Sequence, residues 1–383
     1  MKDEYRKFFD LIAYSVCSKP LAEGFSCSEK EIKDWYYLST AHDISSIIAY
    51  ALEKNGLYLN DEFSLKFQDE MMFSAGRVAL LGVFYDDVCR SLKNEKVDYV
   101  ALKGAVIRKM YSNDFFRTSS DIDLLVKKDD FDRACRVLSR DLGLKGAYRS
   151  SHDLALVRSP FETVEIHYSL IEDERANNAN ELLKNAWTYA TVKEDSEYVF
   201  TTGFFKFYHI THMLKHFEES GCGIRFFLDL YYLRELKDDE DFFRRALDKY
   251  GLTKFYDTCE KLLDYWLIGG DAEKTVLKMN AFVLSSGLYG SVNNYVAIGK
   301  KKSGGKLRYV FKRIFLPYDK LRLFFPKLEG KKWLTPFYQV KRWALVLFGG
   351  RLKSKITELK HAGVNDGSQA DKIRDLFDEL GIK

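Results

Sequence analysis

The chain has 383 residues, of which 46% are hydrophobic and 15% aromatic, enough to bury a sizeable core and to form two to three structural units. Its six cysteines include no Cys-x-x-Cys pair, which argues against a zinc ribbon or a disulfide framework and favours a reducing cytoplasm. No apolar run is long enough for a transmembrane segment and the first residues lack the apolar region of a signal peptide, so we expect a cytoplasmic protein.

The formal net charge of +4 conceals an uneven distribution along the chain. Residues 301–360 hold seventeen Lys and Arg against three acidic residues, so the remainder of the chain is acidic. This basic stretch has three interpretations: a solvated face of a helical subdomain, a surface for an anionic polymer such as nucleic acid, or an interfacial membrane site that uses Trp333 and Trp343. We rank the solvated face first, because charge alone predicts non-specific attraction and no named partner.

The first 93 residues are predicted to form a helical segment, because their apolar residues recur at spacings of three and four. The Asn55-Gly56 pair is typical of a helix C-terminus. The predicted helices cover residues 5–16, 29–38, 43–54 and 63–93.

Residues 94–200 are predicted to form an α/β core. Runs of β-branched and aromatic residues predict strands, and the segment Ser159-Pro160-Phe161-Glu162 between two such runs predicts a hairpin. The predicted order is a strand over 97–102, a helix over 105–110, a strand over 117–126, a helix over 129–142 that ends at Gly143, and hairpin strands over 154–158 and 163–168.

The pattern becomes helical again after this core, and we divide the remainder into a helical domain, residues 201–299, and a basic C-terminal region, residues 300–383. The expected fold class is therefore α+β, with a small mixed sheet embedded between helical segments. The predicted helices cover 204–217, 224–236, 239–249, 255–267 and 271–284, followed by a flexible polar linker over 300–306 and amphipathic pieces over 309–316 and 338–348.

Two carboxylates, Asp121 and Asp123, stand two residues apart at the start of an apolar strand. Successive strand side chains point to opposite faces, so both carboxylates are predicted to project from one face while Ile122 and Leu124 point to the other. Glu165 alternates in the same way in a second strand and joins the pair if the strands are neighbours. Because aspartate is depleted in strands, we favour a functional pair over ordinary carboxylates on an edge strand. Three oxygen ligands suit Mg²⁺ or Mn²⁺ better than zinc.

The residues around this pair form a longer motif. Its elements, in order, are Leu102-Lys103-Gly104, Tyr111, Arg117, residues 121–126 and Glu165-Ile166-His167. In order and spacing the motif resembles the bacterial family of uncharacterised nucleotidyltransferases, within the DNA polymerase beta superfamily. The likeness is sharpest over residues 100–170 and weaker around residues 212–216 and 225–230. The chain departs from much of the superfamily at Gly104-Ala105, where many members carry Gly-Gly or Gly-Ser.

The resemblance implies a nucleotide site beside the metal ligands. Asp121, Asp123 and Glu165 would be the catalytic residues and the ligands of the cations, with Glu165 on the acceptor side, binding a metal or taking a proton. Gly104 permits close approach of the backbone to phosphate, and amides opening the following helix can face phosphate oxygens. The local candidates for the remaining triphosphate contacts are Lys103, Arg117, Ser119 and Ser120. Arg117 has a structural alternative, an ion pair with Asp114 or Asp121.

Three histidines, His209, His212 and His216, share one face of a predicted helix with Lys215 beside them. No Glu or Cys completes a zinc site there, so zinc is the poorer hypothesis. The resemblance places His212, Lys215 and His216 after the catalytic sheet, where Lys215 could reach a phosphate; buried histidines that bridge helices are an equal alternative.

Two further polar residues have mainly structural interpretations. Asp229 lies in an apolar run and needs a partner such as Arg225 or a histidine. His167 is expected to orient Glu165 or to touch the substrate, with the supporting role favoured. His152 has no convincing partner in the sequence.

These residues predict a Mg²⁺-dependent enzyme that transfers a nucleoside monophosphate from an NTP to an unidentified acceptor hydroxyl, with release of pyrophosphate. One alternative is an inactive nucleotide-binding or regulatory module, against which the three intact carboxylates argue. The other is a toxin-type nucleotidyltransferase that acts on RNA or protein. The acceptor is not specified by any residue of the sequence.

Overall fold

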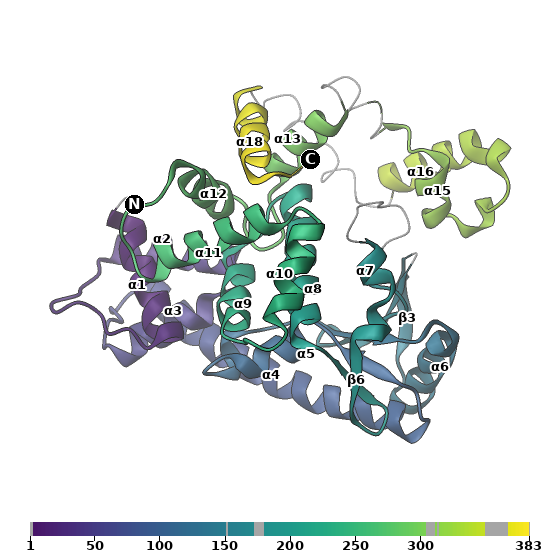
Figure 1. Ribbon diagram of the computed structural model, residues 1–383, viewed down its shortest axis with the longest axis horizontal. Helices are drawn as coiled ribbons and strands as arrows, with labels where there is room; N and C mark the ends of the chain where they lie inside the picture. Colours follow the sequence, from purple (N-terminus) through teal and green to yellow (C-terminus); the bar gives the residue numbers. More distant parts are fainter. Residues whose placement is uncertain are drawn as a thin grey trace. The chain divides into compact units, whose positions relative to one another are not determined.

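The computed structural model describes residues 3–150, 152–171, 180–303, 311, 314–348 and 367–382, and the chain forms two compact units. Unit 1 contains Met1–Met213 and Gly223–Leu277, and unit 2 contains Leu214–Cys222 and Lys278–Lys383. The expected α+β class is confirmed, since a mixed sheet lies among many helices (Figure 1).

Four helices open unit 1, and each end lies within three residues of the predicted one. Side chains cap the second and the fourth of them: Ser28 forms a capping box with Glu31, and the Asp61 carboxylate accepts from two amides in the first turn of the fourth helix. The helices are α1 (Asp3–Cys17), α2 (Glu29–Ala41), α3 (Ser45–Lys54) and α4 (Glu62–Asn94).

The sheet has seven strands in the order β3-β4-β5-β2-β1-β7-β6. β1 is antiparallel to β2 and parallel to β7, β2 is parallel to β5, and the remaining pairs are antiparallel, so the sheet is mixed as predicted. The strands are β1 (Tyr99–Ala101), β2 (Ile122–Val126), β3 (Lys145–Arg149), β4 (Asp153–Ser159), β5 (Glu162–His167), β6 (Ala190–Glu194) and β7 (Glu197–Phe200).

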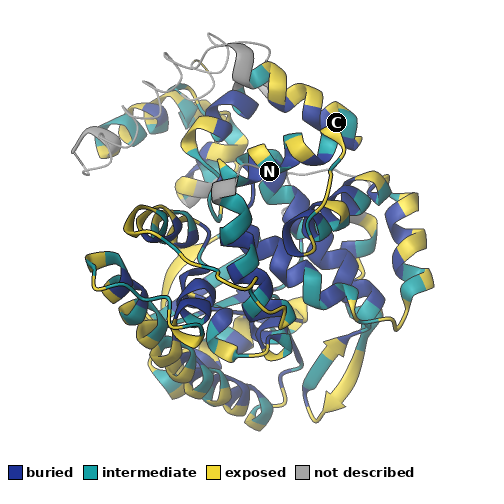
Figure 2. Cartoon of the chain, turned by 90° about the vertical axis from the view of Figure 1, so that its left-hand side faces the viewer, coloured by how far each residue is buried: buried dark blue, intermediate teal, exposed yellow. Residues whose placement is uncertain are grey.

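One face of this sheet packs against α4 and α6 (Phe131–Leu142). Phe84 and Val88 of α4 share a core cluster with Leu124 of β2 and Ile166 of β5. Figure 2 shows helices that are buried along one side and exposed along the other, the amphipathic pattern that apolar spacing predicts. Because alternate residues of β2 and β5 enter this core, the residues between them face away from it.

The other helices of unit 1 largely follow the prediction. The helix expected over 105–110 is shorter than predicted, because α5 ends at Ile107 and residues Arg108–Met110 form a 3₁₀ turn. The helices are α5 (Gly104–Ile107), α7 (Asn180–Lys184), α8 (Thr202–Glu219), α9 (Ile224–Arg234), α10 (Glu240–Lys249), α11 (Thr253–Leu267) and α12 (Lys274–Leu284); α8 and α12 continue into unit 2.

Unit 2 contains four more helices among its described residues. Phe217, Phe282 and Phe377 pack together, with ring centroids of Phe217 and Phe282 4.7 Å apart. The helices are α13 (Val292–Ser303), α15 (Tyr318–Phe324), α16 (Thr335–Phe348) and α18 (Gly367–Leu380).

Two predictions about local structure were wrong. The strand expected over 117–126 begins only at Ile122, because the Arg117 and Thr118 side chains bond to groups outside the sheet and residues 117–121 form a loop. The linker expected over 300–306 is helical through Ser303, and residues 304–306 lie outside the described part of the chain, as does half of the piece expected over 309–316.

Three strands were not predicted at all. β3 exposes every side chain and β6 nearly every one, so neither shows the alternation that marks a half-buried strand. β7 extends the sheet through its pairing with β1, and it brings β6 with it as an antiparallel partner.

Candidate active site

Parallel pairing of β2 with β5 places Asp123 beside Glu165 in register. The neighbouring Ile122 and Leu124 are buried in the core, so Asp123 and Glu165 lie on the opposite face of the sheet. His167 lies two residues beyond Glu165, and one ligand atom from each of these three residues lies within 4.8 Å of the others. Asp121 directly precedes β2. The structure therefore brings Asp123 and Glu165 together as strand alternation predicted, whereas Asp121 lies in the loop before β2, where the Asp123 charge acts on it.

Asp123 is the most buried of the three carboxylates and has two direct partners. Lys103 Nζ and His167 Nε2 each lie 2.8 Å from Asp123 Oδ1. Burial alone would raise the pKa of Asp123, but the Lys103 ammonium and the His167 ring together hold it well below its usual value. Asp123 is therefore ionised at neutral pH.

The two flanking carboxylates behave in the opposite way. Burial and then the Asp123 charge raise the pKa of Asp121 to about 6, and the same two causes raise that of Glu165 to about 7. Like charges at close range disfavour ionisation of all three groups together. A divalent cation relieves this repulsion, and carboxylate oxygens are the donors that Mg²⁺ and Mn²⁺ prefer, so these residues fit such an ion.

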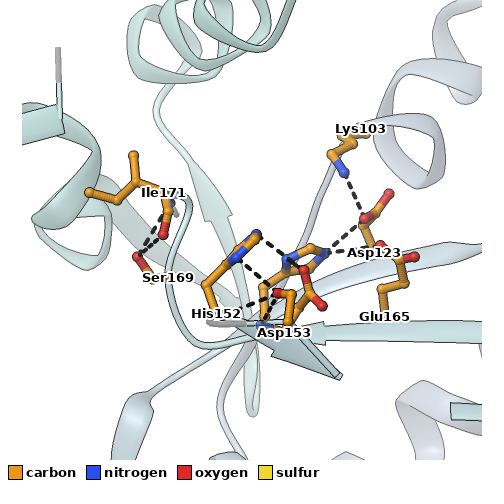
Figure 3. Close-up of polar contacts among 9 residues, drawn as sticks. Lys103, Asp123, His152, Asp153, Glu165, Ser169 and Ile171 are labelled. Carbon is orange, nitrogen blue, oxygen red and sulfur yellow. Dashed lines mark hydrogen bonds and ion pairs between the residues drawn. The ribbon is translucent and has the colours of Figure 1, made fainter. Parts of the chain in front are cut away.

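Lys103 ends the connection from β1 and has a left-handed backbone, with φ 44° and ψ −120°. Such a conformation is unfavourable for a residue with a Cβ atom, and at functional sites it is often retained because it aims a side chain. Here the Lys103 side chain points at Asp123 (Figure 3). Burial alone would lower the pKa of Lys103, but its neighbours, Asp123 first among them, together raise it above its usual value, so the ammonium stays charged.

Gly104 is required for close packing. A Cβ atom at this position would lie 2.3 Å from Ser119 Oγ and 3.5 Å from an Arg117 nitrogen. The amides of Ala105 and Val106, expected to face phosphate, already donate to the Leu102 and Lys103 carbonyls. The turn therefore holds the loop over 117–121 against the start of α5, and its contact with phosphate remains a prediction.

The two serines of this loop differ. Ser119 is buried, and its hydroxyl has no hydrogen-bond partner within the described chain. Ser120 is exposed. A buried hydroxyl without a partner is costly, so Ser119 Oγ is the better candidate for a substrate contact.

Arg117 pairs with a residue that sequence reasoning did not suggest. Its Nε and Nη2 donate to the two carboxylate oxygens of Asp229 on α9 at 2.7 and 2.9 Å, and Tyr111 donates to the same carboxylate at 2.8 Å. The sequence had suggested Asp114 or Asp121 for Arg117, and Arg225 or a histidine for Asp229. The Arg117 charge does act on Asp121, and both His209 and Arg225 help to lower the pKa of Asp229, while Arg225 also pairs with Asp43. The Arg117 fork expected at the triphosphate is thus engaged in anchoring the loop that carries Asp121.

The histidines of α8 have separate environments. His209 is buried and its Nε2 donates to the Phe226 carbonyl at 3.1 Å, a structural role. His212 packs against the rings of Tyr208 and Phe226. Lys215 and His216 belong to unit 2, where the His216 ring lies against Tyr289. The proposed phosphate contact of Lys215 stays a prediction.

Three further polar residues, two of them beside the site, were not singled out as site residues from the sequence. Asp153 lies opposite His167 in the β4–β5 register, and His152, for which no partner was expected, lies 3.1 Å from Asp153. Arg108 is 7% exposed, yet its Nη1 has no hydrogen-bond partner in the described structure. Burial and then Arg117 lower the pKa of Arg108, so this guanidinium is poorly compensated. The feature of the sequence that could have pointed to Arg108 is its charge at a position one helical turn after Gly104.

Comparison with known proteins identifies the family. The family model described as uncharacterised nucleotidyltransferase matches residues 28–267, which include the carboxylate site. The chain belongs to this family. No curated protein and no solved structure matches it. No helix in the described part of the chain is both long and apolar enough to cross a bilayer.

Proposed function

We propose that this nucleotidyltransferase is a polymerase beta-like enzyme that uses Mg²⁺ or Mn²⁺ to transfer a nucleoside monophosphate from an NTP to an acceptor hydroxyl. The observation that carries the proposal is the register of β2 with β5, which places Asp123 beside Glu165 with Asp121 next to them. Family membership supports the reaction class, and the oxygen-rich donor set supports the choice of cation.

Asp121, Asp123 and Glu165 would hold the cations. When bound, these ions supply a polarised α-phosphate, a more acidic acceptor hydroxyl and neutralisation of the leaving pyrophosphate. The acceptor oxygen forms a bond to the α-phosphorus as the bond from that phosphorus to the bridging oxygen breaks, and pyrophosphate leaves with the bonding electrons. Glu165, whose side chain is 33% exposed against 7% for Asp123, is the accessible carboxylate that would take the acceptor proton.

Residues beside the carboxylates would receive the triphosphate. Lys103 contributes a charged ammonium whose partner, Asp123, would turn to a cation when one is present. Ser119 Oγ and Arg108 Nη1 are donors whose hydrogen bonds are unmade. Each would gain its first partner from a phosphate oxygen, which is the physical reason for proposing them.

The test is incubation of the purified chain with labelled NTPs, Mg²⁺ or Mn²⁺ and a cell extract, followed by identification of what becomes labelled. Asp123→Asn should abolish labelling and remain folded. Asp98→Asn is the matched control, because Asp98 precedes β1 and pairs with Lys127, whose side chain is 47% exposed, away from the carboxylate site. Labelling that persists in Asp123→Asn would exclude this assignment of the motif.

The same experiment separates the alternatives. A chain that binds NTP and labels nothing would be a nucleotide-binding or regulatory module. Label on RNA or on a protein of the extract would identify a toxin-type enzyme.

The basic stretch of unit 2 carries a second candidate function. Trp333, Phe337 and Val340 follow one another at helical spacing and are 78%, 65% and 70% exposed, with Lys332 and Lys341 beside them. Exposed aromatic residues among lysines are typical of an interfacial membrane site and not of an ordinary solvated face. We therefore propose that unit 2 contacts anionic lipid. The chain should co-sediment with anionic vesicles and not with zwitterionic ones, and Trp333→Ala should reduce this binding. Retention of the chain by RNA as strong as its binding to anionic vesicles would favour the anionic-polymer alternative.

A further inference from the structure

A second cluster of possible ligands shares His167 with the carboxylate site, and its other two members take no part in the proposed reaction. It consists of His152, Asp153 and His167, whose side chains are only 12%, 13% and 7% exposed. Asp153 opens β4 and is paired with His167 of β5, and His152 directly precedes Asp153. One ligand atom from each of the three lies within 4.8 Å of the others, and Figure 3 shows His152 and Asp153 side by side.

The spacing of these atoms is close to that of a metal site. Asp153 Oδ2 lies 3.1 Å from His152 Nε2 and 3.8 Å from His167 Nδ1. In a tetrahedral zinc site with bonds of about 2.0–2.1 Å, two ligand atoms are about 3.3 Å apart. Small side-chain movements would therefore bring all three atoms to coordination distance.

The second nitrogen of each histidine already has the partner that metal-binding histidines need. His167 Nε2 lies 2.8 Å from Asp123 Oδ1, and His152 Nδ1 lies 3.0 Å from Ser150 Oγ. When Nε2 of a neutral His167 donates to Asp123, its Nδ1 presents a lone pair toward the Asp153 carboxylate. Histidine ligands of metals almost always bond their other nitrogen to a carboxylate, carbonyl or water in this way, which fixes the ring and its tautomer.

We propose that His152, Asp153 and His167 bind one transition-metal ion of the Zn²⁺ class. Two imidazole nitrogens and one carboxylate oxygen favour zinc over Mg²⁺, which prefers oxygen donors throughout. Three protein ligands leave a fourth position for water or a substrate group. This site is distinct from that of the proposed catalytic cations. It would still influence that site, because the ion would hold His167 in the tautomer that donates to Asp123.

The test measures metal binding by the full chain, without any activity. The chain is stripped with a chelator and titrated with Zn²⁺ in excess Mg²⁺ against a chromophoric indicator, with the bound metal counted by mass spectrometry. Wild type should bind one Zn²⁺. His152→Ala should weaken this binding about 100-fold or more, and Ser150→Ala, which removes only the support of that histidine, about 10-fold. Glu165→Gln is the matched control, because it alters the oxygen site and leaves the three ligands intact.

Three results would overturn the proposal: no zinc bound by wild type, a folded His152→Ala that binds zinc as tightly, or zinc lost from Glu165→Gln and retained by His152→Ala. If His152→Ala does not fold, protection of the His152 and His167 rings of wild type from diethylpyrocarbonate by Zn²⁺ decides the same question, and unprotected rings refute the site. Zinc binding by a chain that transfers no nucleotide would leave this inference standing and remove the proposed function. Nucleotide transfer by a chain that binds no zinc would leave the proposed function standing and remove this inference.

Discussion

Removal of the Asp229 carboxylate should destabilise the fold more than loss of any exposed ion pair. The Asp229 and Arg117 side chains are 3% and 8% exposed and share two hydrogen bonds of 2.7 and 2.9 Å, with Tyr111 as a third partner. In Asp229→Ala the Arg117 charge stays buried without its counter-ion, which costs about 3–5 kcal/mol. Since domains are stable by about 5–15 kcal/mol, this loss is a large share of the total.

The assay is urea unfolding followed by circular dichroism. Asp87→Ala is the matched control, because Asp87 pairs on the surface of α4 with Arg90, which is 68% exposed, and such pairs are worth about 0–1 kcal/mol. The double variant Arg117→Met, Asp229→Leu removes both charges and should recover most of the stability that Asp229→Ala loses. The reasoning is refuted if Asp229→Ala unfolds at the same urea concentration as Asp87→Ala, or if the double variant is no more stable than the single one.

Three further predictions follow from the same region. Gly104→Ala should weaken NTP binding and lower the free energy of unfolding, because the added Cβ would lie 2.3 Å from Ser119 Oγ. The double variant Gly104→Ala, Ser119→Ala should recover the lost stability in the urea assay. A double variant as unstable as Gly104→Ala would contradict this. Arg108→Met should lower the affinity for NTP, which calorimetric titration measures, and unchanged affinity would argue against a phosphate contact of Arg108. The urea midpoint of this variant should stay equal or rise, since a poorly compensated buried charge is removed. Burial would raise the pKa of Asp229, but Arg117 lowers it below the unfolded value of about 3.9. The ion pair therefore stabilises the fold above about pH 4, and this contribution is lost as pH falls through the pKa of the folded state. Acid titration in moderate urea should show a loss of stability that Asp229→Asn does not show.

The sequence alone determined the elements whose signal is local. Helices α1, α2 and α4 each bury one face, so their apolar residues recur with the helical period, and side-chain caps such as Asp61 mark the starts of α2 and α4. Strand alternation was likewise enough to place Ile122 and Leu124 in the core and Asp123 on the other face. The edge strands β3 and β6 escaped prediction because they are exposed on both faces and are held by backbone pairing, which leaves no pattern in the side chains.

Only the tertiary structure decided which polar residues meet. Arg117 and Asp229 are 112 positions apart, and a charged residue in an apolar run indicates that a partner exists without indicating which one. His152 and Asp153 gained their importance from the register of β4 with β5, since backbone hydrogen bonds set in the folded sheet bring them to His167. The pairing of Asp123 with Glu165 could be predicted because both residues follow the two-residue period of a strand. The position of Asp121 in the preceding loop, the ion pairs and the histidine contacts depend instead on which segments pack together, and that is decided by the burial of the whole chain.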